Sequence, residues 1–262
     1  MLKSIRVGMG QMLVEGGALE ANLERAIAFI EEARERACDL LILPECLDLG
    51  WTFADSRNLA QPIPGQVSEI LCEGARRSGI EVVAGVTERE GDRVYNASIW
   101  ISKQGEILGR HRKINLLDIA RDLYTPGFSL SVFESSIGPV GMTICADNFP
   151  ESLDLARSLA RMGARLIASP CAWAVDSDHD QRTDPYGDLW RGSYGALTRE
   201  WEVSMIGVSN VGWISSGPWK SRKCIGCSLA MGPGGKILTE GPYGEEAEDL
   251  IVLDLELPRF PS

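Results

Sequence analysis

Apolar residues recur along this chain with two different spacings. Between about residues 18 and 37 they return every three or four positions, which is typical of a helix with one buried face. The run 39–43 that follows is apolar at nearly every position and stops at Pro44, so we expect a short strand covered on both faces. The same order of helix, apolar strand and proline returns at 153–170, and this repetition predicts two similar halves.

The rest of the chain continues the alternation of helices and strands. Further helices are predicted at 66–78 and 186–200, and hairpin turns at 103–105, 134–138 and 232–235. The predicted strands are 4–11, 80–87, 93–102, 106–110, 130–133, 139–144, 164–169, 203–209, 225–231, 236–239 and 250–255. Apolar strands that alternate with helices indicate an α/β fold in which helices cover sheets. No break in composition divides the chain, so we expect one domain over residues 1–262.

The balance of acidic and basic residues limits the kinds of molecule that this protein can bind. The chain has 37 acidic and 26 basic residues, a net charge of −11, and its basic residues form no cluster that could follow a phosphate backbone or an anionic membrane. No run of apolar residues is long enough to span a bilayer, and the N-terminus lacks the apolar core of a secretion signal. We therefore expect a cytoplasmic protein that acts on a small molecule, without nucleic acid or membrane.

The numbers of histidine and cysteine residues limit the kinds of catalysis and metal binding that this chain can support. Only His111 and His179 are present, so His-rich metal sites and Cys/His or Ser/His proteases are disfavoured. The seven cysteines are odd in number and scattered, which favours free thiols in a reducing compartment. Cys224 and Cys227 form a lone C-x-x-C, and because a structural zinc site needs four ligands we favour packing over a redox or metal role. We expect no metal and no cofactor.

Three residues that follow predicted strands could carry out chemistry. Cys145 lies at a turn between a strand and a helix, where a nucleophile is held rigidly; the alternative is a buried structural cysteine. Glu45 ends an apolar strand and could act as a base, or could be a simple turn residue. Lys113 could stabilise an anion, or could belong to a solvated basic run. Each has an ordinary structural explanation by itself, and only the three together favour catalysis.

Segments 43–45, 111–116 and 143–151 resemble the signature stretches of the nitrilase, or carbon–nitrogen hydrolase, superfamily in their order and in the intervals of 68 and 32 residues between Glu45, Lys113 and Cys145. Shorter segments that are similar to family landmarks lie at 95–98, 103–106, 125–127 and 138–141. The resemblance covers about residues 5–255. It implies a four-layer αββα sandwich and a Glu-Lys-Cys triad: Glu45 the general base, Lys113 the oxyanion-stabilising cation and Cys145 the nucleophile. Such a triad needs no histidine.

One position departs from the family pattern. Many members carry a second glutamate shortly before the Thr-Pro-Gly run, and in this chain Ala120 occupies that place. Asp118 and Asp122 are close in sequence and are the candidates to replace the missing carboxylate. If neither does, Lys113 must be held in another way.

Two further groups of residues bear on the substrate. Trp51, Asn148, Phe149 and Trp173 are the candidates for the pocket wall. Five aspartates crowd the loop 176–188, which could favour cationic or polar amides at the pocket mouth, although a solvated acidic loop is the simpler interpretation.

These observations favour a hydrolase that cleaves a non-peptide C–N bond in a small amide or N-carbamoyl compound through an acyl-enzyme on Cys145. A nitrilase acting on a C≡N group would share the triad. A protein of another class, a catalytically weakened binding or interaction protein, finds its main support in Ala120. The resemblance also implies a homodimer or a larger homo-oligomer.

Overall fold

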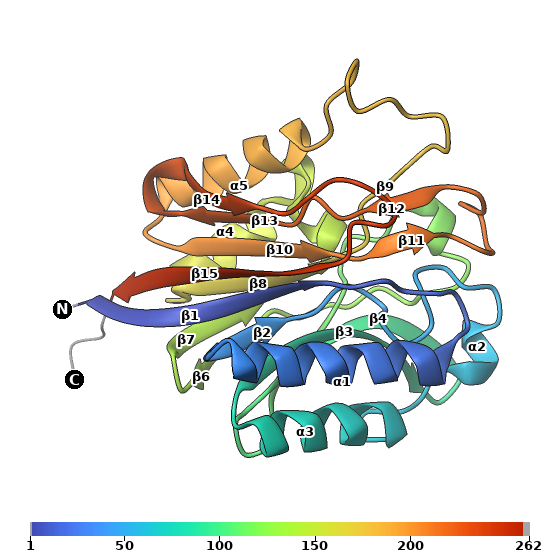
Figure 1. Ribbon diagram of the computed structural model, residues 1–262, viewed down its shortest axis with the longest axis horizontal. Helices are drawn as coiled ribbons and strands as arrows, with labels where there is room; N and C mark the ends of the chain where they lie inside the picture. The colour runs from blue at the N-terminus through green and yellow to red at the C-terminus, as the bar shows by residue number, and fades with distance from the viewer. Residues whose placement is uncertain (1, 259–262) are drawn as a thin grey trace.

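The computed structural model describes residues 2–258 and shows two six-stranded sheets packed face to face (Figure 1). In spatial order, the first sheet contains β15 (Asp249–Pro258), β1 (Leu2–Gln11), β2 (Leu40–Ile42), β3 (Glu81–Glu90), β4 (Arg93–Ile101) and β5 (Ile107–Arg112). The second contains β14 (Lys236–Glu240), β13 (Leu229–Gly232), β10 (Ser204–Ser209), β8 (Leu166–Cys171), β7 (Gly138–Met142) and β6 (Val132–Ser135).

Helices cover the outer face of each sheet. In Figure 1, α1 (Leu19–Glu35) and α3 (Gln66–Ser78) lie below the first sheet, and α5 (Asp188–Glu200) lies above the second. The helix α4 (Asp154–Arg161) packs with α5 against the outer face of the second sheet. A short helix α2 (Ser56–Leu59) and a small sheet of β11 (Val211–Trp213), β12 (Lys223–Ile225) and β9 (Ala174–Val175) complete one end. The order of layers is helix, sheet, sheet, helix, so the predicted αββα sandwich is confirmed. Within residues 2–258, no helix is both long and apolar enough to cross a bilayer.

The continuous apolar runs are explained by burial on both faces of the central strands. Side chains alternate along a strand, so Leu40 and Ile42 of β2 enter the core between the sheets, whereas Leu41 enters the core beneath α1 and α3. In β8, Leu166 likewise faces the core between the sheets and Ile167 faces α4 and α5.

The structure also explains the repeated sequence pattern. β2 lies between two parallel neighbours, β1 and β3, and β8 lies between two parallel neighbours, β10 and β7. Each of the two central strands follows a helix that covers its own sheet. The prediction of two similar halves is therefore confirmed.

Some predicted boundaries are wrong. The strand expected at 225–231 is divided, because Gly226 and Cys227 have φ angles of 63° and 59°, which an extended strand cannot contain. Ile225 therefore ends β12 in the small sheet, and Leu229 begins β13 in the large one. The strand expected at 139–144 ends at Met142, since the chain turns there. The elements α2, β9 and β11 are too short to produce a periodic signal in the sequence.

Several strands end at the same side of the sandwich. β5 runs in the same direction as β2, because β3 is parallel to β2 and β4 is antiparallel to both β3 and β5. β7 and β8 are parallel to each other and, with β10, point to the right-hand end of Figure 1, as does β1. The loops that follow β2, β5, β7 and β8 therefore meet at this end, where α/β sheets commonly place their sites.

Asp48 is a fully buried carboxylate in the loop after β2. Its two oxygens accept hydrogen bonds from the backbone N–H and the hydroxyl of Thr87 at 3.0–3.1 Å. Burial raises the pKa of Asp48 to about 6, although the hydrogen bonds from Thr87 act in the opposite direction. The folded protein consequently holds this proton to a higher pH than the unfolded chain does.

We expect the stability contributed by Asp48 to fall as the pH rises from about 4 to about 6, by about 3 kcal/mol, and to stay constant above that window. Urea unfolding of wild type and Asp48→Asn at pH 4 and pH 7 measures this. The variant should gain stability relative to wild type between the two values. An equal difference at both values would contradict the prediction.

Candidate active site

Glu45 and Lys113 form a buried ion pair where the loops meet. Glu45 follows β2, and its backbone N–H donates to the carbonyl of Cys171 at 3.2 Å, across to the second sheet. Lys113 follows β5, and its Nζ lies 2.6 Å from Oε1 of Glu45. The side chains are only 1% and 2% exposed, respectively. Among residues 2–258, Oε2 of Glu45 has no hydrogen-bond partner although it is buried, so one carboxylate oxygen is left for another group.

The charge of Lys113 is stabilised by its partners. Burial lowers the pKa of Lys113, but the negative charge of Glu45, followed by that of a Cys145 thiolate, raises it by more. The net effect places the pKa of Lys113 above its usual value, so the ammonium group stays charged across the physiological range.

Asn96 in β4 connects both members of this pair. Its Nδ2 donates to Oε1 of Glu45 at 2.5 Å, and its backbone carbonyl accepts the N–H of Lys113 at 2.8 Å. Gly85 in β3 makes room for the glutamate, because a Cβ at this position would lie 2.6 Å from the Cα of Glu45. The sequence did not identify either residue as functional, although Asn96 falls within the landmark segment 95–98.

Cys145 begins a 3₁₀ turn, Cys145–Asn148, and is separated by two residues from the end of β7 at Met142. Its φ of 43° lies in the left-handed region, which is uncommon outside glycine and carries strain at a functional position. Its backbone N–H donates to Oγ of Ser169 at 3.1 Å, which ties the turn to β8. The expected turn between a strand and a helix is therefore present, with the cysteine half-buried at its first position.

The surroundings of Cys145 keep its thiol protonated in the resting protein. Interaction with the thiol of Cys171, burial and the charge of Glu45 raise the pKa of Cys145 well above its usual value, while the charge of Lys113 opposes them. A nucleophilic thiolate therefore requires a base at the moment of attack. The unpaired Oε2 of Glu45 is a buried oxygen that could accept this proton.

The residues expected in the pocket wall lie around these groups. The ring of Trp51 is centred 6.0 Å from Nζ of Lys113. The side-chain amide of Asn148 donates to the carbonyl of Cys145 at 3.2 Å and to Oγ of Ser169 at 3.0 Å, so Asn148 supports the turn. Phe149 and Trp173 both pack on Trp190, with ring centroids 5.5 and 4.7 Å away, in the aromatic cluster that Cys145 also contacts.

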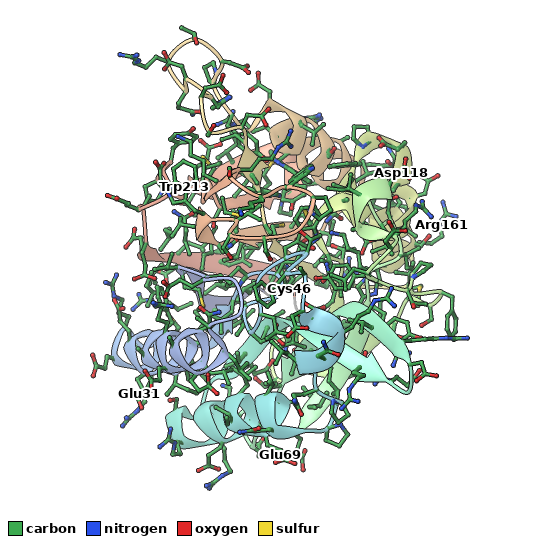
Figure 2. All side chains as sticks on the ribbon, turned by 90° about the vertical axis from the view of Figure 1, so that its right-hand side faces the viewer. Glu31, Cys46, Glu69, Asp118, Arg161 and Trp213 are labelled. Carbon is green, nitrogen blue, oxygen red and sulfur yellow. The ribbon has the colours of Figure 1, made fainter. Side chains whose placement is uncertain are left out.

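Neither Asp118 nor Asp122 replaces the missing glutamate. The side chain of Asp118 is 97% exposed and forms an ion pair with Arg121, and Asp122 is also exposed. In Figure 2, Asp118 lies near the margin of the molecule and Cys46, the residue after Glu45, lies near the centre. Within residues 2–258, no carboxylate other than Glu45 pairs with Lys113. Ala120 is buried in an apolar cluster with Trp51, so this side of the site is apolar.

The acidic loop 176–188 projects away from the body of the protein, before α5 (Figure 1). Asp180 pairs with Arg182, Asp188 with Arg191 and Asp176 with Arg222. Because neighbouring arginines neutralise these three aspartates, the structure favours a solvated loop over a cation-selecting mouth.

Comparison with known proteins places this chain in a family. The profile of the carbon–nitrogen hydrolase family matches residues 6–260, and the chain belongs to this family. It is 31% identical to a nitrilase of Pyrococcus abyssi, with 99% of this chain and 92% of that protein covered. It is 34% identical to the omega-amidase NIT2 of Danio rerio over 58% of each chain.

The fold agrees with solved structures. The crystal structure of Nit3 of Saccharomyces cerevisiae, a member of branch 10 of the nitrilase superfamily, superposes with a TM-score of 0.82 at 26% identity, with 97% of this chain and 90% of that chain covered. The protein is accordingly a carbon–nitrogen hydrolase, as the resemblance in the sequence predicted.

We expect iodoacetamide to label Cys145 before the other six cysteines at neutral pH. Cys46 and Cys171 are fully buried, whereas Cys145 is half-buried. Cys72 and Cys227 are also half-buried, but Cys145 interacts with both the carboxylate of Glu45 and the ammonium of Lys113, the groups that we expect to activate its thiol. Brief labelling followed by peptide mass spectrometry identifies the first site. Preferential labelling of Cys46 or Cys171 would contradict the assignment of the nucleophile.

Proposed function

We propose that this enzyme hydrolyses the C–N bond of a small amide or N-carbamoyl compound through a covalent intermediate on Cys145. The observation that carries the proposal is that the two carboxylate oxygens of Glu45 have different surroundings. Oε1 is held by Lys113 and Asn96, while Oε2 is buried and free to take a proton. Glu45 is the general base, Lys113 the oxyanion-stabilising cation and Cys145 the nucleophile.

The chemical steps follow from these roles. Glu45 removes the proton from the Cys145 thiol, and the sulfur attacks the carbonyl carbon of the substrate. Negative charge develops on the carbonyl oxygen, where the ammonium of Lys113 and a backbone N–H near Ala146 stabilise it. The tetrahedral intermediate collapses, and the protonated Glu45 returns its proton to the leaving ammonia or amine. Glu45 then deprotonates a water molecule, whose oxygen attacks the carbonyl carbon of the thioester. The C–S bond breaks, the carboxylic acid is released, and Glu45 returns its proton to the sulfur of Cys145.

Nitrile hydrolysis is the second candidate. It is favoured by the 31% identity to the Pyrococcus abyssi nitrilase over nearly the whole chain. Attack by Cys145 on a nitrile carbon would give a thioimidate, and addition of water would release ammonia and leave the same thioester. The two substrates therefore share the triad and differ in the first adduct.

The wall of the site bears on the substrate. Trp51 and Ala120 belong to an apolar cluster on the side of Lys113, and Phe149 and Trp173 belong to an aromatic cluster on the side of Cys145. Small, neutral acyl groups fit such walls, and Trp51, Asn148, Phe149 and Trp173 are the proposed substrate-contacting or supporting residues.

The cell compartment and assembly are also part of the proposal. All seven cysteines are free thiols, which supports a reducing compartment such as the cytoplasm. The homodimer or larger homo-oligomer implied by the family resemblance stays a prediction.

Ammonia release from a panel of amides, N-carbamoyl compounds and nitriles tests the proposal, with Cys145→Ala as the control. Turnover of an amide or carbamoyl compound that disappears in the variant supports it. Turnover of nitriles alone would select the second candidate, and activity that persists in Cys145→Ala would overturn both.

A further inference from the structure

The carboxylate of Asp147 joins the two segments that carry Lys113 and Cys145. Its Oδ1 accepts hydrogen bonds from the backbone N–H groups of Ile114 at 3.0 Å and Asn115 at 2.7 Å, the two residues after Lys113. Its Oδ2 accepts the N–H of Ile144 at 2.9 Å, directly before Cys145. Asp147 is fully buried, so these bonds are not exchanged for bonds to bulk water.

His111 adds a contact on the other side of the lysine. Its Nε2 lies 2.8 Å from Oδ2 of Asp147, and the ring is 4% exposed. His111 belongs to β5, two residues before Lys113, so Asp147 holds the lysine-bearing segment both before and after the lysine. The amide of Asn115 further donates to the carbonyl of Ala146 at 2.7 Å, which reinforces the same connection.

The hydrogen bonds of Asp147 can hold the lysine-bearing segment and the turn at Cys145 in a fixed relative position. Hydrogen bonds to a carboxylate are stronger and more directional than those between neutral groups. The left-handed φ of Cys145 persists only where its surroundings hold the turn, and the bond from the N–H of Ile144 does this directly. A single side chain thus fixes the strained turn and the lysine-bearing segment relative to each other.

We propose that Asp147 is a positioning residue that aligns the Lys113 ammonium with the Cys145 sulfur for stabilisation of the oxyanion. This inference rests on the proposed function, because it assumes that Lys113 and Cys145 act on the same substrate atoms. The carboxylate of Asp147 is bonded to backbone N–H groups and to His111, so its effect on the reaction is indirect. A residue with this role changes the rate of the chemical step more than it changes substrate binding.

Asp147→Asn tests the proposal, because it keeps the shape of the side chain but replaces one acceptor oxygen by an NH₂ group. We expect kcat to fall by about 10²-fold, the loss typical of a misplacement of about 1 Å. KM should change little, and the alkylation of Cys145 by iodoacetamide should slow. Alkylation needs no substrate, so it reports the alignment even if the correct amide has not been found.

Glu81→Gln is the matched control. Glu81 is a carboxylate with 1% exposure that also links the two sheets, accepting hydrogen bonds from Nε1 of Trp100 at 2.6 Å and the N–H of Ser136 at 2.7 Å. It begins β3 and therefore lies at the opposite end of the sandwich from Glu45. We expect this variant to lose stability while kcat and the alkylation rate stay at the wild-type level. An Asp147→Asn protein that is folded and matches Glu81→Gln in both rates would overturn the proposal.

A second pair of variants keeps the test decisive if Asp147→Asn does not fold. His111→Ala removes only one of the contacts to Asp147, whereas the side-chain amide of Gln in His111→Gln can still donate to Oδ2. We expect the alkylation rate and kcat to fall in His111→Ala and to recover in His111→Gln. Equal rates in the two variants would overturn the proposal.

Slower alkylation in Asp147→Asn, in a protein that hydrolyses none of the panel, would retain the alignment and reject the proposed function.

Discussion

Cys145→Ala should abolish turnover of every amide, carbamoyl compound and nitrile that the wild-type protein hydrolyses. In the proposed mechanism the sulfur forms the covalent bond to substrate, and loss of a nucleophile commonly costs at least about 10⁴-fold in kcat. Because Cys145 is half-buried and the substitution removes only Sγ, we expect the free energy of unfolding to change by about 1 kcal/mol or less. Ammonia release and urea unfolding measure the two effects separately.

Cys72→Ala is the control for this variant. Cys72 is also half-buried, but it lies on α3, on the outer face of the first sheet and away from the site. It should retain wild-type turnover. Measurable turnover by Cys145→Ala, at a rate near that of Cys72→Ala, would show that another group carries out the attack.

Lys113→Ala should lower kcat by at least about 10²-fold, as expected for the loss of a group that stabilises an oxyanion. It should also destabilise the fold, because it leaves the carboxylate of Glu45 buried without its counter-ion, and breaking a buried pair costs about 3–5 kcal/mol. Kinetics at a temperature well below the unfolding transition separate the two consequences.

The double variant Glu45→Gln with Lys113→Ala separates catalysis from stability. It removes both buried charges, so much of the stability lost in Lys113→Ala should return while activity stays absent. A Lys113→Ala protein that is folded and turns over substrate at a near-wild-type rate would exclude the lysine from the chemistry. Recovery of activity in the double variant would exclude both residues.

The sequence predicts most of the fold because its signals are local. The helical spacing at 18–37 and the apolar run 39–43 reflect how α1 and β2 are buried, and both appear nearly where expected. The divided strand at 225–231 shows the limit of that reasoning. Its apolar residues satisfy a strand pattern, but the left-handed conformations of Gly226 and Cys227 send the two parts into different sheets.

The residues of the candidate site likewise fall into two groups, those that the sequence predicts and those that only the structure identifies. Glu45, Lys113 and Cys145 are predicted from the sequence because each follows a predicted strand and because the three segments resemble a known family. Asn96 is a different case, because it lies 51 residues from the carboxylate that it holds. Nothing in its neighbours indicates a buried partner. The replacement for the second glutamate is likewise undecidable from the sequence, since only the structure shows Asp118 in solvent.

The division of the site between the two sheets has a mechanical consequence. Glu45 and Lys113 follow strands of the first sheet and Cys145 follows a strand of the second, so the three proposed catalytic residues meet across the interface between the two sheets. The apolar cluster between the two sheets, which includes Val83 and Met142, would therefore set the distances between these three residues as well as contribute to stability. A small shift of one sheet against the other would separate Glu45, the proposed base, from Cys145, the proposed nucleophile, while each sheet kept its own secondary structure. Loss of activity on heating should consequently precede loss of the helical signal.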